Sequence, residues 1–213
     1  MNIYKSLLVL YRPCEKSSRT ASGPYIRIKR EEKMESDRKT IKIALTGVMM
    51  GLVLVTTMMI RIHVPFTQGY VHLGDAMIFL SVLVLGRNYG TLAAGIGSAL
   101  SDLLSGYAYY APWTFVVKAL MAFVVGAALE YMEKKGKFSV GRRTPLELLA
   151  MLFGGIEMTV GYYIAASLMQ GNWVTPLYSV PGNIGQFIVG MILATALAKV
   201  LYRTPARKYF EIK

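Results

Sequence analysis

The sequence predicts an all-α integral membrane protein with six transmembrane helices and with its N-terminus and C-terminus in the cytoplasm. Three observations lead to this prediction. The 213 residues are 54% hydrophobic and 17% charged, which is too little charge for the surface of a soluble domain of this size. Basic residues concentrate in alternate connections between apolar stretches. Those stretches number six, at residues 42–60, 70–86, 89–105, 113–131, 146–169 and 179–201.

The chain divides by composition into three regions. Residues 1–40 are polar and basic with little periodicity, so we expect a cytoplasmic tail that is disordered. Residues 41–203 form the six-helix membrane domain, and residues 204–213 form a second cytoplasmic tail. An alternative start of translation at Met34 would leave residues 1–33 outside the protein. The early apolar run LLVLY is too short for a signal peptide.

The second and third apolar segments are short and close together. At about 1.5 Å per residue the oily part of residues 73–86 covers about 21 Å, less than the ~30 Å hydrocarbon core, so protein should cover its outer end. The sequence GRNYG at 86–90 predicts a tight helical hairpin. Pro112 lies in an aromatic surface loop at 106–113, and Pro145 ends a charged connection at 133–145. Both prolines stand where prolines start helices.

The positions of the basic residues predict the orientation. With a cytoplasmic N-terminus, Arg61 is the one basic residue of the outer connections. The inner connections and the tail hold the others, among them Arg87, Lys134, Lys135, Lys137, Arg142 and Arg143. Cytoplasmic loops are enriched in Lys and Arg. The same distribution accounts for the net charge of +12 without a nucleic-acid partner.

Polar residues lie on the small-residue faces of the predicted helices. Residues four apart share a helix face, and small residues let helices pack closely in lipid. A charge at mid-bilayer costs about 3 kcal/mol unless it has a partner or a wet cavity. We therefore expect a polar pocket in the outer half of the bundle. Its candidate residues are Asp75, Asp102, Tyr109, Trp113, Lys118, Glu157, Asn183 and Gln186.

Structural roles for the same residues stay open at this point. Lys118 could pair with Asp102 or Glu157 only to hold the bundle together. Asp75 could stabilise the positive end of its own helix, and the aromatic loop could be an interfacial belt. The combination of aromatics, amides and charges on one side of a bundle nevertheless suits a small planar polar ligand.

The first helix carries a smooth face without polar groups, formed by Ala44, Gly47, Val48 and Gly51. Such a face packs on another helix of the same chain or of a partner. The single cysteine and the two histidines exclude a disulfide framework and make a metal site or a metal cofactor unexpected. A GxxxxGK[ST] phosphate loop is absent from the sequence, so ATP hydrolysis by this chain is not expected.

Three stretches carry a resemblance to a known family. HLGDAMIFLSVLVLG, GSALSDLLSGYAYYAPWTFVVKALMAFVVG and PGNIGQFIVG resemble, in order and spacing, the substrate-binding S components of energy-coupling factor (ECF) transporters. The resemblance covers residues 40–203. It implies a pocket near the outer face for a water-soluble vitamin, a membrane coupling (T) protein, two ATPase subunits, no cofactor, and location in the bacterial plasma membrane.

The resemblance also suggests roles for particular segments. In the family an AxxxA-type motif on the first helix contacts the coupling protein; here the match is Ala44 to Val48, with valine in the second position. The outer segments 61–72 and 106–112 would serve as lids. Lys118 with Asn183 and Gln186 would suit a hydroxylated heteroaromatic ring, so we favour a pyridoxine- or hydroxymethylpyrimidine-like ligand and place riboflavin second.

Two other classes compete with transport. An intramembrane aspartyl protease would use Asp75 and Asp102 as a catalytic pair, but its GxGD signature requires glycine where His72 stands, and both acids lie at helix ends rather than at a matched depth. A membrane scaffold protein would bind no soluble ligand.

Overall fold

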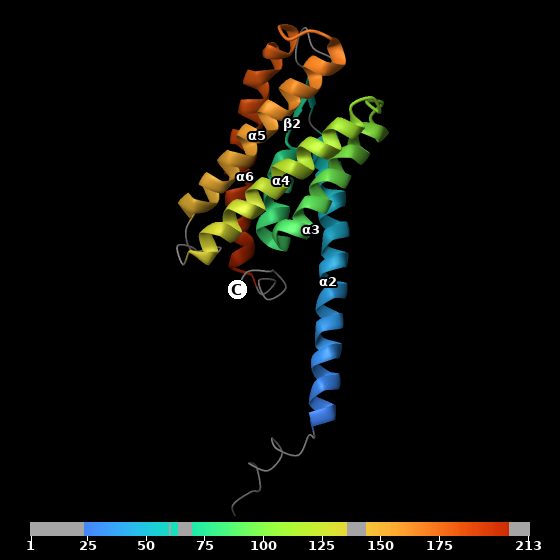
Figure 1. The fold of residues 1–213 in the computed structure, drawn as a ribbon, viewed down its shortest axis with the longest axis vertical. Helices are drawn as coiled ribbons and strands as arrows, with labels where there is room; N and C mark the ends of the chain where they lie inside the picture. The colour runs from blue at the N-terminus through green and yellow to red at the C-terminus, as the bar shows by residue number, and fades with distance from the viewer. Residues whose placement is uncertain (1–23, 60, 64–69, 136–143, 205–213) are drawn as a thin grey trace, which may run out of the picture. The chain divides into compact units, whose positions relative to one another are not determined.

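A computed structural model describes residues 24–59, 61–63, 70–135 and 144–204, and it is all-helical apart from one short β-ribbon. Figure 1 shows the arrangement. The helices are α2 (Pro24–Met59), α3 (Gly74–Leu104), α4 (Ala111–Lys134), α5 (Thr144–Gln170), the 3-10 helix η1 (Thr175–Ser179) and α6 (Val180–Tyr202); the strands are β1 (Arg61–His63) and β2 (Tyr70–His72).

The chain forms two compact units, residues 1–40 and 41–213. In the first unit α2 begins at Pro24, where the sequence favoured a disordered tail. The segment after Pro24 is rich in Lys, Glu, Arg and Met, which have high helix propensity. Lys39 and Glu35 also pair across one turn at 2.8 Å. The expectations for residues 1–23 and for the tail at 205–213 lie outside the described residues.

Five helices of the described chain are long and apolar enough to cross a membrane. One of them, α3, contains Gly86 with φ 79° and ψ −178°, a backbone conformation open to glycine alone. The chain turns back there, since a Cβ on Gly90 would lie 2.7 Å from Cα of Val82. The halves of α3 on either side of Gly86 correspond to the second and third predicted helices. That both halves cross the bilayer stays a prediction.

The second predicted helix starts later than expected. Residues 70–72 are strand β2, which pairs antiparallel with β1 in the register Arg61↔His72, Ile62↔Val71 and His63↔Tyr70. The helix therefore begins at Gly74 rather than at residue 70. Pro112 does stand in the first turn of α4, and α5 begins at Thr144, just before Pro145. The charged connection at 136–143 lies outside the described residues.

Small residues bring the helices of the second unit together. A Cβ on Gly155 of α5 would lie 2.4 Å from the ring of Phe187 on α6, and one on Gly154 would lie 2.4 Å from Val125 on α4. Close backbone approach of this kind is the usual means of helix association in lipid. Large apolar side chains on the outer sides of these helices remain exposed, as expected for surfaces that face acyl chains.

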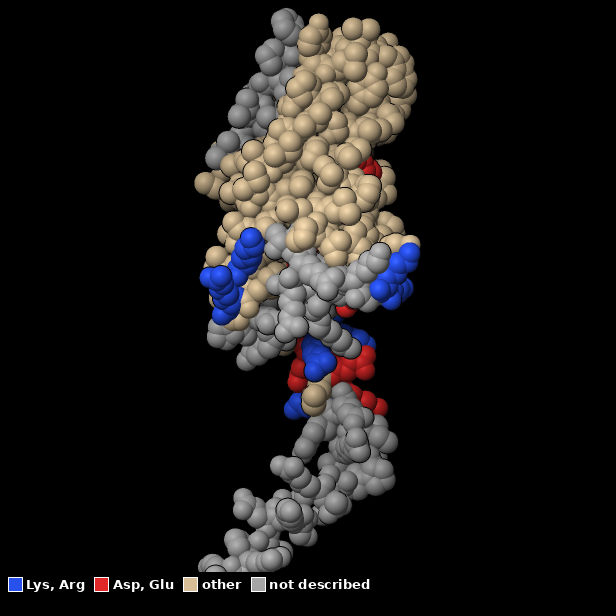
Figure 2. Space-filling view, turned by 90° about the vertical axis from the view of Figure 1, so that its left-hand side faces the viewer, with Lys and Arg blue, Asp and Glu red and all other residues tan. Residues whose placement is uncertain are grey.

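Charged residues of the second unit gather at one end. Lys42 lies over the ring of Tyr89 at 5.8 Å, and Arg87 pairs with Glu130 near the end of α4. On the face shown in Figure 2, Lys and Arg side chains lie near this end of the second unit, and the tan surface above it shows none. The asymmetry is the one that the positive-inside rule associates with a cytoplasmic face.

Candidate functional site

An ion pair between α4 and α3 lies at the centre of the second unit. Lys118 Nζ donates to Asp75 Oδ1, and both side chains are 0% exposed. Asp75 lies in the first turn of α3, but no side chain caps this helix, so its carboxylate serves the ion pair rather than a cap. The sequence left open a pair of Lys118 with Asp102 or Glu157; the ion pair that the structure shows for Lys118 is with Asp75.

Gln186 of α6 joins the ion pair to the β-ribbon. Its Nε2 donates to Asp75 Oδ2 at 2.8 Å, and its Oε1 accepts the backbone N–H of His72 at 2.8 Å. His72 Nδ1 in turn accepts the N–H of Gly74 at 2.9 Å. The NH2 group and the oxygen of the buried Gln186 amide both form hydrogen bonds, and these connect β2 to the ion pair of Asp75 and Lys118.

Three further side chains complete the cluster and were not predicted from the sequence. Lys118 Nζ lies 2.9 Å from Met158 Sδ and 5.3 Å from the ring centroid of Tyr162, a cation–π distance. The Tyr162 hydroxyl lies 3.3 Å from Thr114 Oγ1. Helical spacing was the available signal, since Thr114 is four residues before Lys118 and Tyr162 four after Met158. We call these three residues and Asp75, Lys118, Gln186 and His72 the polar cluster.

Two of the predicted site residues, Asn183 and Glu157, lie on the helices that carry the cluster. Asn183 is buried one turn before Gln186 on α6. Glu157 is half-buried beside Met158 on α5, and its Oε2 is a buried atom without a hydrogen-bond partner. A Cβ on Gly161 would lie 3.5 Å from its other oxygen, so the carboxylate is packed beside the next turn of its own helix.

The remaining predicted site residues lie elsewhere. Asp102 is buried near Tyr110 in the α3–α4 loop. Burial raises the pKa of Tyr110; a hydrogen bond with Gln170 opposes this shift, and the nearby Tyr109 and Asp102 add to it. Tyr109 is 66% exposed and Trp113 is 37% exposed, so neither ring belongs to the buried cluster. Tyr109 lies in the loop between α3 and α4, whereas Trp113 lies in the first turn of α4.

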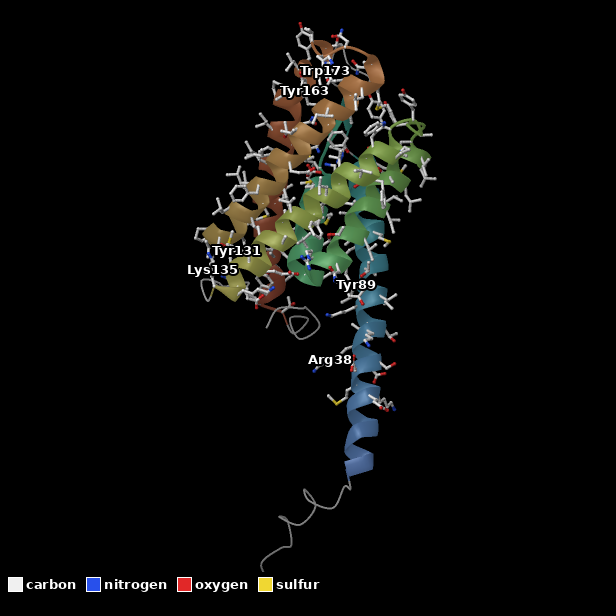
Figure 3. The ribbon with its side chains drawn as sticks, in the orientation of Figure 1. Arg38, Tyr89, Tyr131, Lys135, Tyr163 and Trp173 are labelled. Atoms are coloured by element: carbon white, nitrogen blue, oxygen red, sulfur yellow. The ribbon has the colours of Figure 1, made fainter. Side chains whose placement is uncertain are left out.

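A second aromatic pair lies at the end of α5. The rings of Tyr163 and Trp173 are 6.0 Å apart, and the Tyr163 hydroxyl donates to the Trp173 carbonyl at 3.0 Å (Figure 3). Trp173 is exposed in the segment that follows α5, a position that suits a membrane–water interface. The exposure of Tyr109 and Trp113 is compatible with the same interpretation, and their role as ligand contacts stays a prediction.

The smooth face of α2 is open. Ala44, Gly47, Val48 and Gly51 are all exposed, and a Cβ added to Gly47 or Gly51 would meet nothing within 4 Å. The helix packs through its opposite side, formed by Thr46, Met49, Val53 and Thr57, all buried. The sequence left open whether this face packs on another helix of the same chain, and no helix among the described residues covers it.

Replacing Gln186 with leucine should loosen the β-ribbon. The substitution leaves the His72 N–H and one oxygen of Asp75 without hydrogen-bond partners, and each unsatisfied buried group costs about 1–3 kcal/mol. We expect the His72 amide to exchange its hydrogen at least tenfold faster, measured by hydrogen–deuterium exchange in nanodiscs. Thr195→Val is the matched control on α6, because Thr195 Oγ1 bonds only the carbonyl of Met191 in its own helix. Equal exchange in both variants would contradict the link.

The bundle, its buried polar cluster and its one basic end define a polytopic membrane protein of the transporter class. Residues 37–203 match the family described as "ECF-type riboflavin transporter, S component". Because the match spans most of the sequence, the chain belongs to this family. The fold and family are those of transporter components rather than enzymes.

The chain is also similar to two proteins and to one solved structure. An uncharacterised protein of Pyrococcus woesei, from the gap 3'region, is 36% identical over 70% of this chain and 93% of its own length. The thiamine precursor transporter HmpT of Lactococcus lactis subsp. cremoris is 25% identical over 79% of this chain and 92% of its own. The crystal structure of the S component for biotin from an ECF-type ABC transporter matches with a TM-score of 0.62 at 20% identity, covering 82% of this chain and 98% of that one.

The site itself does not resemble a carboxylate pair. Asp75 is bound by Lys118 and Gln186, whereas Asp102 lies beside Tyr110. A protease needs two facing carboxylates that share a reacting water. The described geometry therefore offers no support for the aspartyl protease alternative.

Proposed function

We propose that this chain captures a small water-soluble vitamin or vitamin precursor outside the cell and delivers it to an ECF-type importer. The observation that carries the proposal is the polar cluster, in which groups from α3, α4, α5 and α6 meet beneath a β-ribbon inside an apolar bundle. Polar groups at such depth are usually functional. The β-ribbon, tied to the cluster by Gln186, is suited to act as a lid over a ligand.

The ligand class follows from the groups that still have hydrogen-bonding capacity. Asn183 brings a buried amide, and Glu157 Oε2 is a buried atom without a hydrogen-bond partner. Together with the ring of Tyr162 they can receive a flat ring that carries polar substituents. A hydroxymethylpyrimidine- or pyridoxine-like compound fits this set, and the name of the related thiamine precursor transporter supports a pyrimidine.

Riboflavin is the second candidate. The matching family is described by that vitamin, and riboflavin also combines a flat heterocycle with hydroxyl groups. It is larger than a single-ring compound, so it would require more displacement of the β-ribbon. A direct comparison of the two ligand sizes separates the candidates.

Energy for uptake would come from partners. We propose that the open face Ala44, Gly47, Val48 and Gly51 of α2 docks on the membrane coupling protein, which carries two ATPase subunits. The basic end of the bundle would then face the cytoplasm with both termini, and the protein would reside in the bacterial plasma membrane. The exposure of all four residues supports an intermolecular contact.

Ligand binding by the purified full chain tests the proposal. Calorimetry in detergent should give tighter binding of hydroxymethylpyrimidine or pyridoxine than of riboflavin, by tenfold or more. Asn183→Ala should weaken that binding about tenfold, equivalent to about 1.4 kcal/mol, through loss of one polar contact. Thr195→Val should bind as the parent does. If none of the three compounds binds, the capture function is wrong; if riboflavin binds tightest, the ligand order is reversed.

A further inference from the structure

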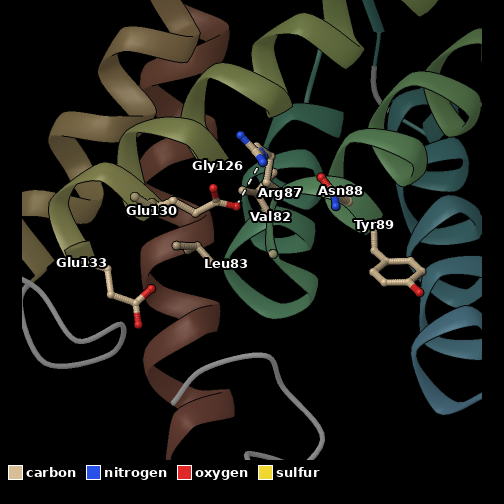
Figure 4. Close-up of a pocket in the computed structure, with 10 residues that line it drawn as sticks. Val82, Leu83, Arg87, Asn88, Tyr89, Gly126, Glu130 and Glu133 are labelled. Carbon is tan, nitrogen blue, oxygen red and sulfur yellow. Dashed lines mark ion pairs between the residues drawn. The ribbon is translucent and has the colours of Figure 1, made fainter. Parts of the chain in front are cut away.

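A pocket lies at the opposite end of the bundle from the β-ribbon, outside the polar cluster. It has a volume of about 260 Å³ and is formed at the Gly86 turn of α3 and the last turns of α4 (Figure 4). Val82, Leu83 and Leu129 line it with apolar surface. Its polar lining includes Arg87, Glu130 and Glu133. The capture of a vitamin, as proposed above, uses none of these residues.

Arg87 and Glu130 form an ion pair within this pocket. Arg87 Nε lies 3.3 Å from Glu130 Oε1, yet this nitrogen is buried and makes no hydrogen bond. The Arg87 guanidinium also lies 5.1 Å from the ring centroid of Phe123, and a Cβ on Gly126 would lie 2.6 Å from its Cβ. Contacts with Phe123 and Gly126 therefore hold the Arg87 side chain in position together with the ion pair. The other N–H groups of the guanidinium can still donate hydrogen bonds.

The carboxylates exceed the guanidinium in number. Glu133 follows Glu130 by one helical turn on α4, and it is exposed at the mouth of the pocket. Among the described residues that line the pocket, one cation is set against two anions, although the pocket lies at the basic end of the unit. Such a site should repel a simple anion and accept a group that brings its own positive charge.

The depth of the pocket is that of a membrane–water interface. Arg87 and Asn88 occupy the polar turn between the two apolar halves of α3, and the apolar part of α4 ends at Glu130. Lys135 Nζ lies 4.4 Å from the ring centroid of Tyr131 in the last turn of α4 (Figure 3). Aromatic and basic side chains of this kind anchor helices at the level of lipid head groups.

We propose that this pocket binds the head group of a zwitterionic aminophospholipid. The terminal N–H groups of the Arg87 guanidinium, which the ion pair through Nε does not use, would meet a phosphate oxygen, and the ammonium would donate to Glu130 and Glu133, which can accept several of its three N–H bonds. The apolar residues Val82, Leu83 and Leu129 would contact the glycerol region. The volume suits a head group rather than a drug-sized ligand, whose pockets begin at about 300 Å³.

Native mass spectrometry of the full chain from nanodiscs of defined lipid tests this assignment. Phosphatidylethanolamine should be retained at least tenfold more than phosphatidylcholine, whose trimethylated nitrogen donates no hydrogen bond, and more than phosphatidylglycerol, which has no cation. Glu133→Gln and Arg87→Gln should each reduce that retention fivefold or more. Glu35→Gln, an exposed acid on α2 paired with Lys39, is the matched control and should leave it unchanged.

Other outcomes overturn the proposal. Equal retention of the three lipids, or parental retention in both Glu133→Gln and Arg87→Gln, would show that the pocket does not bind the head group selectively. Glycerophosphoethanolamine supplies the same chemistry without acyl chains, so competition at concentrations comparable to the lipid would assign the pocket to a soluble zwitterion instead. Because Glu133 is exposed, its amide variant should fold, and circular dichroism verifies this.

Discussion

Replacing Lys118 with methionine should lower the free energy of unfolding by about 3–5 kcal/mol, the usual cost of removing one partner of a buried ion pair. Asp75 would keep the hydrogen bond from Gln186 but would lose the cation that neutralises it inside the bundle. Its charge would then lie uncompensated at 0% exposure. Thermal unfolding of the chain in nanodiscs, followed by circular dichroism, measures the loss.

The double variant Asp75→Asn with Lys118→Met provides the control. It removes both charges while an amide at position 75 can still bond Gln186, so most of the stability should return. Glu130→Gln breaks the half-exposed pair with Arg87 and should cost no more than about 1 kcal/mol. If the single variant Lys118→Met is as stable as the double variant, the pair does not hold the bundle as described.

Leucine at both Gly47 and Gly51 should abolish assembly with the coupling protein and reduce uptake to background. The two glycines belong to the open face of α2, where an added Cβ would meet nothing within 4 Å. They would instead separate α2 from a partner helix that requires a smooth surface. Co-purification of the coupling protein and ATPases with the tagged chain measures assembly, and ligand binding by the free chain should remain at the parental level.

Two further substitutions serve as controls for the assembly experiment. Val160→Leu enlarges an exposed apolar residue on α5 and should leave assembly intact. Gly155→Leu places a side chain against Phe187, 2.4 Å from where its Cβ would lie, and should unfold the chain rather than affect assembly alone. Loss of folding in the Gly47 and Gly51 variant would mean internal packing, whereas undiminished assembly would remove α2 as the docking helix.

Much of the fold could be predicted because its causes are local. The length and hydropathy of each segment predict a membrane helix. Gly86 predicts the turn inside α3, since its backbone conformation is open to glycine alone. Small residues at four-residue spacing indicated which helix faces turn inward, and Lys118 and Gln186, which lie on such faces, are buried. The late start of α3 escaped prediction because residues 70–72 pair with residues that precede them by several positions.

The partners within the site depend on how the helices are placed against one another. The spacing along one helix says that Lys118 faces inward, but its choice of Asp75 over Asp102 or Glu157 follows from the relative rotation and axial offset of α3, α4 and α6. Those offsets are set by close contacts such as Gly190 against Asp75, where an added Cβ would lie 2.9 Å away. Residue types and their periodicity thus specify which faces become buried, while packing between distant segments assigns the pairs, because hydrogen bonds and ion pairs need a fit within a few tenths of an ångström that one-dimensional spacing does not contain.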